Sequence, residues 1–247
     1  MGLFGFGKKT DTASTSAPTA APAVTSAPSI DLTKRIDLNK KEVQAICLTK
    51  APLNGLKAKV AFVIDYSGSM RSMYNNGTVQ RTLENIFPIA ATFDDDGSME
   101  CWIFENGYHR LPDVTINNLE GYIARETRAY SMGGTCYAPV IEDIIDTYKK
   151  ETVPAYVVFV TDGDNQDKSK TTKMIIEASK YPIFWQFVGI GNDRFDYLQK
   201  LDDMEGRYVD NADFFKVSEP SKITYNDLLD EFPNWLVMPE VVKMTNR

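Results

Sequence analysis

Three short apolar runs along the chain have the length and composition of buried β-strands. They cover residues 60–64, 156–160 and 183–188. Segments with helical periodicity separate them, because apolar residues recur there at spacings of three and four. Strands that alternate with helices are typical of a parallel sheet covered by helices on both faces. The pattern predicts an α/β fold with a doubly wound, Rossmann-like open sheet.

Four segments place their apolar side chains along one face of a helix. The expected helices span residues 79–93, 139–148, 168–180 and 224–232. Pro139 falls in a first turn, a position that proline tolerates. Thr224 and Asp227 have the spacing of a capping box at the start of the last helix, and we expect Pro233 to end or kink that helix.

One connection departs from the parallel pattern. Residues 99–104 have the composition of a strand, and residues 108–111 can return beside them. The intervening Asn106-Gly107 pair is a strong signal for a tight hairpin. The sheet is therefore expected to be mostly parallel, with one antiparallel strand at its edge.

The first thirty residues differ in composition from the rest of the chain. Ala, Pro, Ser and Thr dominate residues 10–29. Such a segment cannot bury enough apolar surface to offset the entropy lost on ordering, so residues 1–30 are expected to form a disordered arm. Residues 2–6 at its tip are apolar and could contact a partner or a membrane, although a mobile terminus is the simpler interpretation.

The remaining chain divides into three parts. Residues 31–58 form a lead-in segment, and the alternation of apolar positions within residues 42–48 predicts a strand packed on the domain. Residues 59–236 carry the strand and helix pattern and are expected to form the domain itself. Residues 237–247 are expected to be a C-terminal tail.

Composition narrows the class of protein. The 247 residues are 43% hydrophobic and 25% charged, which suits one globular domain with additional chain. No apolar run approaches the roughly 20 residues of a membrane-spanning helix, and the N-terminus lacks the core of a signal peptide. The three cysteines show no CxxC spacing, which argues against disulfides and zinc. We therefore predict a cytoplasmic protein, and a net charge of −7 argues against nucleic-acid binding.

Polar residues with oxygen ligands follow two of the apolar strands. Asp65-Tyr66-Ser67-Gly68-Ser69 comes directly after residues 60–64, and Asp162 follows residues 156–160. Ligands bind outside the carboxyl ends of the strands in open parallel sheets, so these side chains can meet there. The glycine-containing loop before the helix at Pro139 can bring Thr135 to the same place. Carboxylates and hydroxyls are suited to Mg²⁺, which prefers oxygen ligands.

Asp65, Ser67, Ser69, Thr135 and Asp162 resemble, in order and type, the metal-ion-dependent adhesion site of the von Willebrand factor type A (vWA) domain. The resemblance covers about residues 59–236. Residues 133–140, Gly-Gly-Thr-Cys-Tyr-Ala-Pro-Val, look most like the copines and the bacterial tellurium-resistance-associated vWA proteins. The N-terminal arm fits the bacterial branch better, because copines carry lipid-binding domains for which this chain has no room.

The resemblance implies a function. The five residues would bind Mg²⁺, with Mn²⁺ or Ca²⁺ as substitutes, and a partner protein would supply an Asp or Glu to the metal. The protein would act without catalysis, in bacterial tellurium resistance and stress response.

Three alternatives remain at the level of sequence. A serine-rich turn after a strand can simply hydrogen-bond its own backbone. A Mg²⁺-dependent phosphatase of the haloacid-dehalogenase type would also use Asp65, but that family requires an aspartate where Ser67 stands. The metal could also be purely structural. Enzymatic chemistry is otherwise weakly supported, because His109 is the only histidine and lies on the return strand of the hairpin.

Overall fold

The computed structural model describes Met1 and residues 30–245. The prediction of a disordered arm, including its tip at residues 2–6, falls on residues outside this part of the chain and stays a prediction. None of the helices in residues 30–245 combines the length and the apolar character needed to cross a lipid bilayer.

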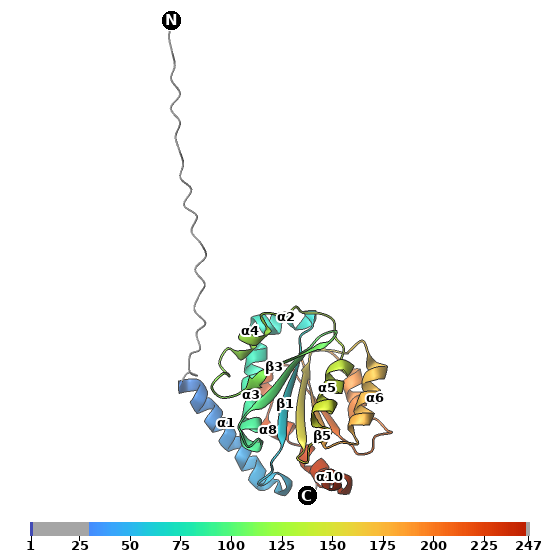
Figure 1. Ribbon diagram of the computed structural model, residues 1–247. Helices are drawn as coiled ribbons and strands as arrows, with labels where there is room; N and C mark the ends of the chain where they lie inside the picture. Colours follow the sequence, from blue (N-terminus) through green and yellow to red (C-terminus); the bar gives the residue numbers. More distant parts are fainter. Residues whose placement is uncertain (2–29, 246–247) are drawn as a thin grey trace.

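A six-stranded sheet forms the centre of residues 30–245, with the strand order β3-β2-β1-β4-β5-β6 (Figure 1). The strands are β1 (Lys59–Asp65), β2 (Met99–Phe104), β3 (Tyr108–Val114), β4 (Ala155–Thr161), β5 (Ile183–Ile190) and β6 (Ala212–Val217). All pairings are parallel except that of β2 with the edge strand β3. The predicted α/β fold with one antiparallel edge strand is thereby confirmed.

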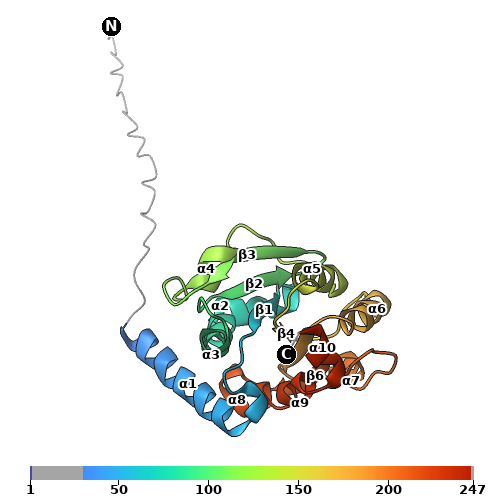
Figure 2. The ribbon, with the colours of Figure 1, turned by 60° about the horizontal axis from the view of Figure 1, so that its bottom comes forward.

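Helices surround this sheet on both faces (Figures 1 and 2). They are α1 (Ile30–Thr49), α2 (Arg71–Asn75), α3 (Thr78–Phe93), α4 (Tyr122–Thr127), α5 (Ala138–Tyr148), α6 (Lys168–Ala178), α7 (Asp196–Asp202), α8 (Tyr225–Leu228), α9 (Phe232–Leu236) and α10 (Pro239–Met244). Short 3-10 turns occur at η1 (Ala51–Leu53), η2 (Gly68–Met70) and η3 (Pro220–Lys222).

The sheet separates two hydrophobic cores. Alternate residues of β1 point to opposite faces, so that Phe62 packs in one core and Val63 in the other. Helices α1, α3, α4, α8, α9 and α10 contribute to the first core, and α5, α6 and α7 contribute to the second. Burial on both faces explains why β1, β4 and β5 are apolar almost throughout instead of alternating with polar residues.

The predicted strand within residues 42–48 is wrong, because this segment is the last part of α1. The buried side chains of α1 include Leu32, Ile36, Val43 and Ile46, which recur at helical spacings of three, four and seven. Ala45, on which the apparent alternation depended, is exposed. The seven-residue window was too short to show the helical period, which is clear over all 20 residues of the helix.

The C-terminal part of the chain also differs from expectation. The single helix predicted for residues 224–232 is two short helices, α8 and α9, and Pro233 lies in the first turn of α9 instead of ending a helix. The capping box is confirmed, because the Asp227 amide donates to Thr224 Oγ1 at 3.1 Å. The predicted tail contains α10, whose Val241 is fully buried, so the packed domain extends beyond residue 236.

Helix α1 packs against α3 and α8 and belongs to the same folded unit as the sheet (Figure 2). An Arg35–Glu84 ion pair also joins α1 to α3. The lead-in segment is therefore part of the core rather than an appendage.

This placement predicts unequal effects of two alanine substitutions in α1. Ile36 is 3% exposed, so Ile36→Ala should lower the free energy of unfolding by about 2–5 kcal/mol, through lost burial and the cavity left behind. Leu38 on the same helix is 65% exposed, and Leu38→Ala should change stability by no more than about 0.5 kcal/mol. Urea unfolding followed by circular dichroism measures both. Equal effects of the two substitutions would show that α1 is not packed on the domain.

Candidate metal centre

The predicted site lies at the carboxyl edge of the sheet, where the direction of strand addition changes. From β1 the chain adds β2 and β3 on one side, and it then returns to add β4 on the other side. Asp65 is the last residue of β1, and Asp162 directly follows β4, which pairs with β1. Two strand ends that are distant in sequence thus present carboxylates at the switch point of the sheet, which is the usual ligand position in open α/β folds.

Asp65 is fully buried and held by donors on both carboxylate oxygens. The Ser67 amide donates to Oδ1 at 2.7 Å, and the hydroxyl of Thr161, the last residue of β4, donates to Oδ2 at 2.7 Å. The Tyr74 hydroxyl donates to the Asp65 carbonyl at 3.0 Å. These contacts fix the carboxylate between two strands and leave it little freedom to turn.

A row of side-chain oxygens continues outward from this carboxylate. Ser67 Oγ lies 2.9 Å from Ser69 Oγ, and Ser69 Oγ donates to Asp162 Oδ1 at 2.9 Å. The structure therefore brings together Asp65, Ser67, Ser69 and Asp162, four of the five residues singled out in the sequence.

The loop that carries Thr135 is attached to the same turn by its backbone. Ser67 forms a parallel bridge with Gly133, and the Gly68 amide donates to the Gly133 carbonyl at 3.0 Å. The Gln166 amide donates to the Thr135 carbonyl at 2.8 Å, which connects the loop to the segment after Asp162. Thr135 is half-buried and lies two residues beyond the bridge. All three segments of the predicted site therefore meet at this edge.

Two glycines permit this close approach. A Cβ atom on Gly133 would lie 2.6 Å from Glu105 Oε2, and one on Gly134 would lie 2.5 Å from Asn106 Oδ1. Both neighbours belong to the β2–β3 hairpin, which packs directly against the loop. A larger side chain at either position would therefore displace the side chains of Glu105 or Asn106 from their present positions against the loop.

Two supporting residues were not identified from sequence. Thr161 ends an apolar strand, and its hydroxyl donates to the Asp65 carboxylate. The sequence feature that could have indicated this role is a hydroxyl residue immediately before Asp162. Asp167, the residue directly before α6, accepts the amides of Tyr137 at 3.0 Å and Ala138 at 2.8 Å. It thereby ties the start of α5, and with it the Thr135 loop, to the segment that follows β4.

Burial controls the protonation of the two carboxylates. Loss of solvent raises the pKa of Asp65 to about 6, although the hydrogen bonds from Thr161 and Ser67 oppose the increase. Burial also raises the pKa of Asp162, against the lowering effect of its hydrogen bond from Ser69. A cation bound here would favour the ionised form of both carboxylates. The two aspartates therefore make the site electrostatically favourable for a positive charge.

The donor set is compatible with a small hard cation. Neighbouring ligands of an octahedral Mg²⁺ with bonds of roughly 2.0–2.1 Å lie about 2.9 Å apart. The spacings from Ser67 to Ser69 and from Ser69 to Asp162 are both 2.9 Å. Within residues 30–245, no group of three or more His, Cys, Asp or Glu residues could hold a metal ion. A metal site in this part of the chain would therefore depend on hydroxyl ligands.

His109 does not contribute to this oxygen cluster. Its ring stacks on Tyr130 with centroids 4.2 Å apart, and Nε2 lies 3.9 Å from Glu105 Oε1. These contacts support a structural role on the edge strand.

Comparison with known proteins agrees with the fold. Residues 57–242 match the family model described as the vWA domain found in the TerF C terminus. The chain belongs to this vWA-TerF-like family. One relative, YcbR of Bacillus subtilis (strain 168), is 43% identical over 209 residues, which cover 80% of this chain and 84% of that protein. The matched region reaches into α10, in agreement with the buried position of that helix.

More distant relatives of this vWA-TerF-like chain are larger proteins. Copine-C of Dictyostelium discoideum is 24% identical over 188 residues, which cover 63% of this chain and 35% of that protein. The E3 ubiquitin-protein ligase RGLG1 of Arabidopsis thaliana is 26% identical over 155 residues, which cover 52% and 32% of the two chains. The chain thus spans about a third of the length of each.

Solved structures share the fold. Proximal thread matrix protein 1 from the mussel byssus superposes with a TM-score of 0.53 at 18% identity, covering 73% of this chain and 46% of that one. The SpRpn10 VWA domain superposes with a TM-score of 0.52 at 14% identity, covering 75% and 97%. At these identities the likeness concerns the fold alone.

The raised pKa of Asp65 predicts that its ionisation destabilises the metal-free protein. The folded pKa of about 6 exceeds the ordinary aspartate pKa of 3.8, so the destabilisation is absent below the lower value and complete above the higher one. In EDTA near neutral pH, Asp65→Asn should therefore raise the free energy of unfolding by about 2–3 kcal/mol. The carboxamide can accept from the Ser67 amide and donate to Thr161, whose hydroxyl can then donate to the Gly163 carbonyl.

Thermal or urea unfolding at two pH values measures this effect. The stability gain of Asp65→Asn should disappear at about pH 3, below the ordinary aspartate pKa of 3.8, where the folded and the unfolded wild type both bind the proton. A gain of the same size at both pH values would contradict an electrostatic origin.

Proposed function

We propose that this vWA domain is a Mg²⁺-dependent protein-binding module that captures an acidic residue of a partner. The observation that carries the proposal is the row of oxygens from Ser67 through Ser69 to Asp162, backed by the buried carboxylate of Asp65. Carboxylate and hydroxyl oxygens are the ligands that a small hard cation such as Mg²⁺ takes in proteins. Mn²⁺ and Ca²⁺ are expected as weaker or alternative ions.

The five residues would have different roles. Ser67, Ser69 and Thr135 would offer neutral hydroxyls to the ion. Both oxygens of Asp65 already accept hydrogen bonds, so this residue would act chiefly by charge and through an ordered water. Asp162 would contribute a carboxylate oxygen at the open side. Bound metal would supply a Lewis-acidic centre, and mostly neutral ligands would leave it able to accept one more carboxylate from an Asp or Glu.

A binding role is better supported than catalysis. The only histidine of the sequence, His109, stacks on Tyr130, and the position that a haloacid-dehalogenase phosphatase needs as a second aspartate is Ser67. Ser67 Oγ contacts the Ser69 hydroxyl, and Ser69 Oγ donates to Asp162, the carboxylate that the proposed ion would occupy and so withdraw from acting as a general base. We therefore propose a non-enzymatic module, with the phosphatase as the alternative to be tested.

The proposed setting is the bacterial cytoplasm, in tellurium resistance or stress response. Support comes from the match to the vWA domain found in the TerF C terminus and from the 43% identity to a Bacillus subtilis protein. The net charge of −7 favours a protein partner over nucleic acid. An acidic partner residue would be attracted to this surface by the metal, not by the protein's overall charge.

Isothermal titration with MgCl₂ tests the metal directly. Wild type should bind one Mg²⁺, and Ser67→Ala should weaken the affinity by about 10–100-fold, a typical loss when a contact of a metal site is removed. Ser72→Ala is a matched control, because Ser72 is an exposed serine in the neighbouring helix α2 and should leave the affinity unchanged. Absence of divalent-ion binding by wild type would refute the proposal.

Affinity capture from cells of the source organism tests partner binding. Capture of a partner should require Mg²⁺, be lost in EDTA, and be lost in Thr135→Ala while circular dichroism shows an intact fold. Replacing the Asp or Glu that the partner supplies to the metal with Ala should have the same effect. Capture that persists in EDTA, with metal affecting only the melting temperature, would instead support a structural metal.

Mg²⁺-dependent turnover of p-nitrophenyl phosphate that Asp65→Asn abolishes would support the phosphatase.

A further inference from the structure

A pocket of about 430 Å³ borders the candidate metal centre at the carboxyl edge of the sheet. One wall comes from residues 66–75, which include α2, and the other from residues 123–132, which include α4. Figure 1 shows α2 and α4 next to each other at this edge. Tyr66 stands between Asp65 and Ser67 in the chain, and Met132 directly precedes Gly133. A partner residue bound to the metal would therefore place its neighbours over this pocket.

The base of the pocket is held by contacts that also support the metal centre. The Tyr66 hydroxyl donates to the carbonyls of Thr127 and Tyr130, both at 3.3 Å, and so joins the two walls. Tyr74 packs edge-on against Tyr66, with ring centroids 5.0 Å apart, and its hydroxyl donates to the Asp65 carbonyl at 3.0 Å. The pocket is therefore preformed and fixed in position relative to the end of β1.

The rim of the pocket is accessible and rich in hydrogen-bond donors. Arg71, Asn75 and Ser131 are exposed. Within the part of the chain that the structure describes, their side chains make no hydrogen bond or ion pair. A guanidinium, an amide and a hydroxyl together offer several N–H and O–H donors. Tyr130 and Met132 are partly exposed and add apolar surface. This combination suits a side chain with a short apolar stem and an anionic end.

The charge of Arg71 is not compensated by its surroundings. No Asp or Glu lines this pocket, although the chain as a whole has a net charge of −7. Other arginines of residues 30–245 pair with a neighbouring carboxylate, namely Arg35, Arg110, Arg125, Arg194 and Arg207. A free guanidinium beside apolar surface is suited to bind a carboxylate with good geometry.

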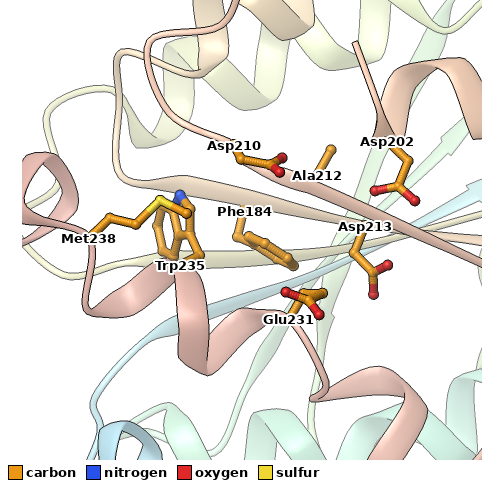
Figure 3. A pocket seen from close by; sticks show the side chains of 8 residues that line it. All are labelled: Phe184, Asp202, Asp210, Ala212, Asp213, Glu231, Trp235 and Met238. Carbon is orange, nitrogen blue, oxygen red and sulfur yellow. The ribbon is translucent and has the colours of Figure 1, made fainter. Parts of the chain in front are cut away.

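The opposite pattern of charge occurs at the amino edge of the sheet. A cavity of about 260 Å³ near the starts of β5 and β6 is lined by four carboxylates, those of Asp202, Asp210, Asp213 and Glu231 (Figure 3). Burial, and then repulsion by neighbouring carboxylates, raise the pKa of Asp202 to about 7. An anionic side chain would be repelled there. Of these two cavities, only the pocket with Arg71 favours an acidic group.

We propose that the pocket binds a second acidic side chain of the partner, whose carboxylate pairs with Arg71 while the first acidic side chain reaches the metal. The inference rests on the proposed metal-dependent capture and adds to it a requirement for two acidic residues. Alternate side chains of an extended chain point the same way and lie roughly 6.5–7 Å apart. The two acids would therefore be close together in the sequence of the partner.

Isothermal titration with synthetic peptides in MgCl₂ tests this inference. The peptides carry Asp and Glu, in either order, separated by one, two or three serines, and each has a matched peptide with Gln in place of Glu. At one or more spacings, wild type should bind the Glu peptide about three- to fivefold more tightly than the Gln peptide, as expected for a partly exposed ion pair. The preference should vanish in Arg71→Gln. It should persist in Arg128→Gln, because Arg128 is an exposed arginine after α4 that does not line the pocket.

The outcomes separate this inference from the proposed function. Mg²⁺ affinity of Arg71→Gln should match that of wild type. If wild type binds Mg²⁺ but does not distinguish Glu from Gln at any spacing, the second acidic contact is wrong and the metal-dependent capture stands. An equal loss of preference in Arg128→Gln would show general charge attraction and also overturn the inference. A peptide with Leu in place of Glu that binds as tightly would show that the pocket takes apolar side chains instead. Absence of Mg²⁺ binding by wild type would refute both proposals.

Discussion

The buried carboxylate of Asp65 is the constraint on which the functional edge depends. Placing a charged group at 0% exposure opposes folding, and the structure offsets the cost with an amide from Ser67 and a hydroxyl from Thr161. The second donor exists only because β1 and β4 run parallel, with Ile64 paired to Val160, so that the next residues of the two strands meet. Strand register, not the local turn alone, therefore sets the geometry of the site.

Close contacts between the surrounding loops fix the position of the loop that carries Thr135 relative to Asp65. Ser67 bridges to Gly133, while Gly134 leaves space for Asn106 of the hairpin. Asp167 connects the start of α5 to the segment after β4. Each link joins two elements that are distant in sequence, so the position of Thr135 is determined by packing between loops. A site supported in this way can remain ordered while its outer face stays open to a partner.

Sequence alone was sufficient for the features that repeat locally. The apolar runs located β1, β4 and β5, the Asn106-Gly107 pair located the hairpin, and strand ends located Asp65 and Asp162. These signals depend on neighbouring residues, which sequence shows directly.

The features that escaped prediction depend on tertiary contacts. Residues 42–48 at the end of α1 look like a strand because a short alternation hides the longer helical period. Helix α10 looks like a tail because its burial comes from contact with the rest of the domain. The supporting roles of Thr161 and Asp167 could not be read from spacing, because their partners lie 96 and about 30 residues away.

Exposure differs along the row of oxygens, and this difference determines what a partner can reach. Asp65 is fully buried and enclosed by the donors from Ser67 and Thr161, so its charge acts from behind the other groups. Ser69 is exposed, and its hydroxyl donates to Asp162 at the outer end of the row. A carboxylate of a partner would approach from this outer end, where Asp162 would repel it unless a cation lay between the two groups. The proposed requirement for a metal ion therefore follows from the order of exposed and buried charges, and not only from the types of ligand.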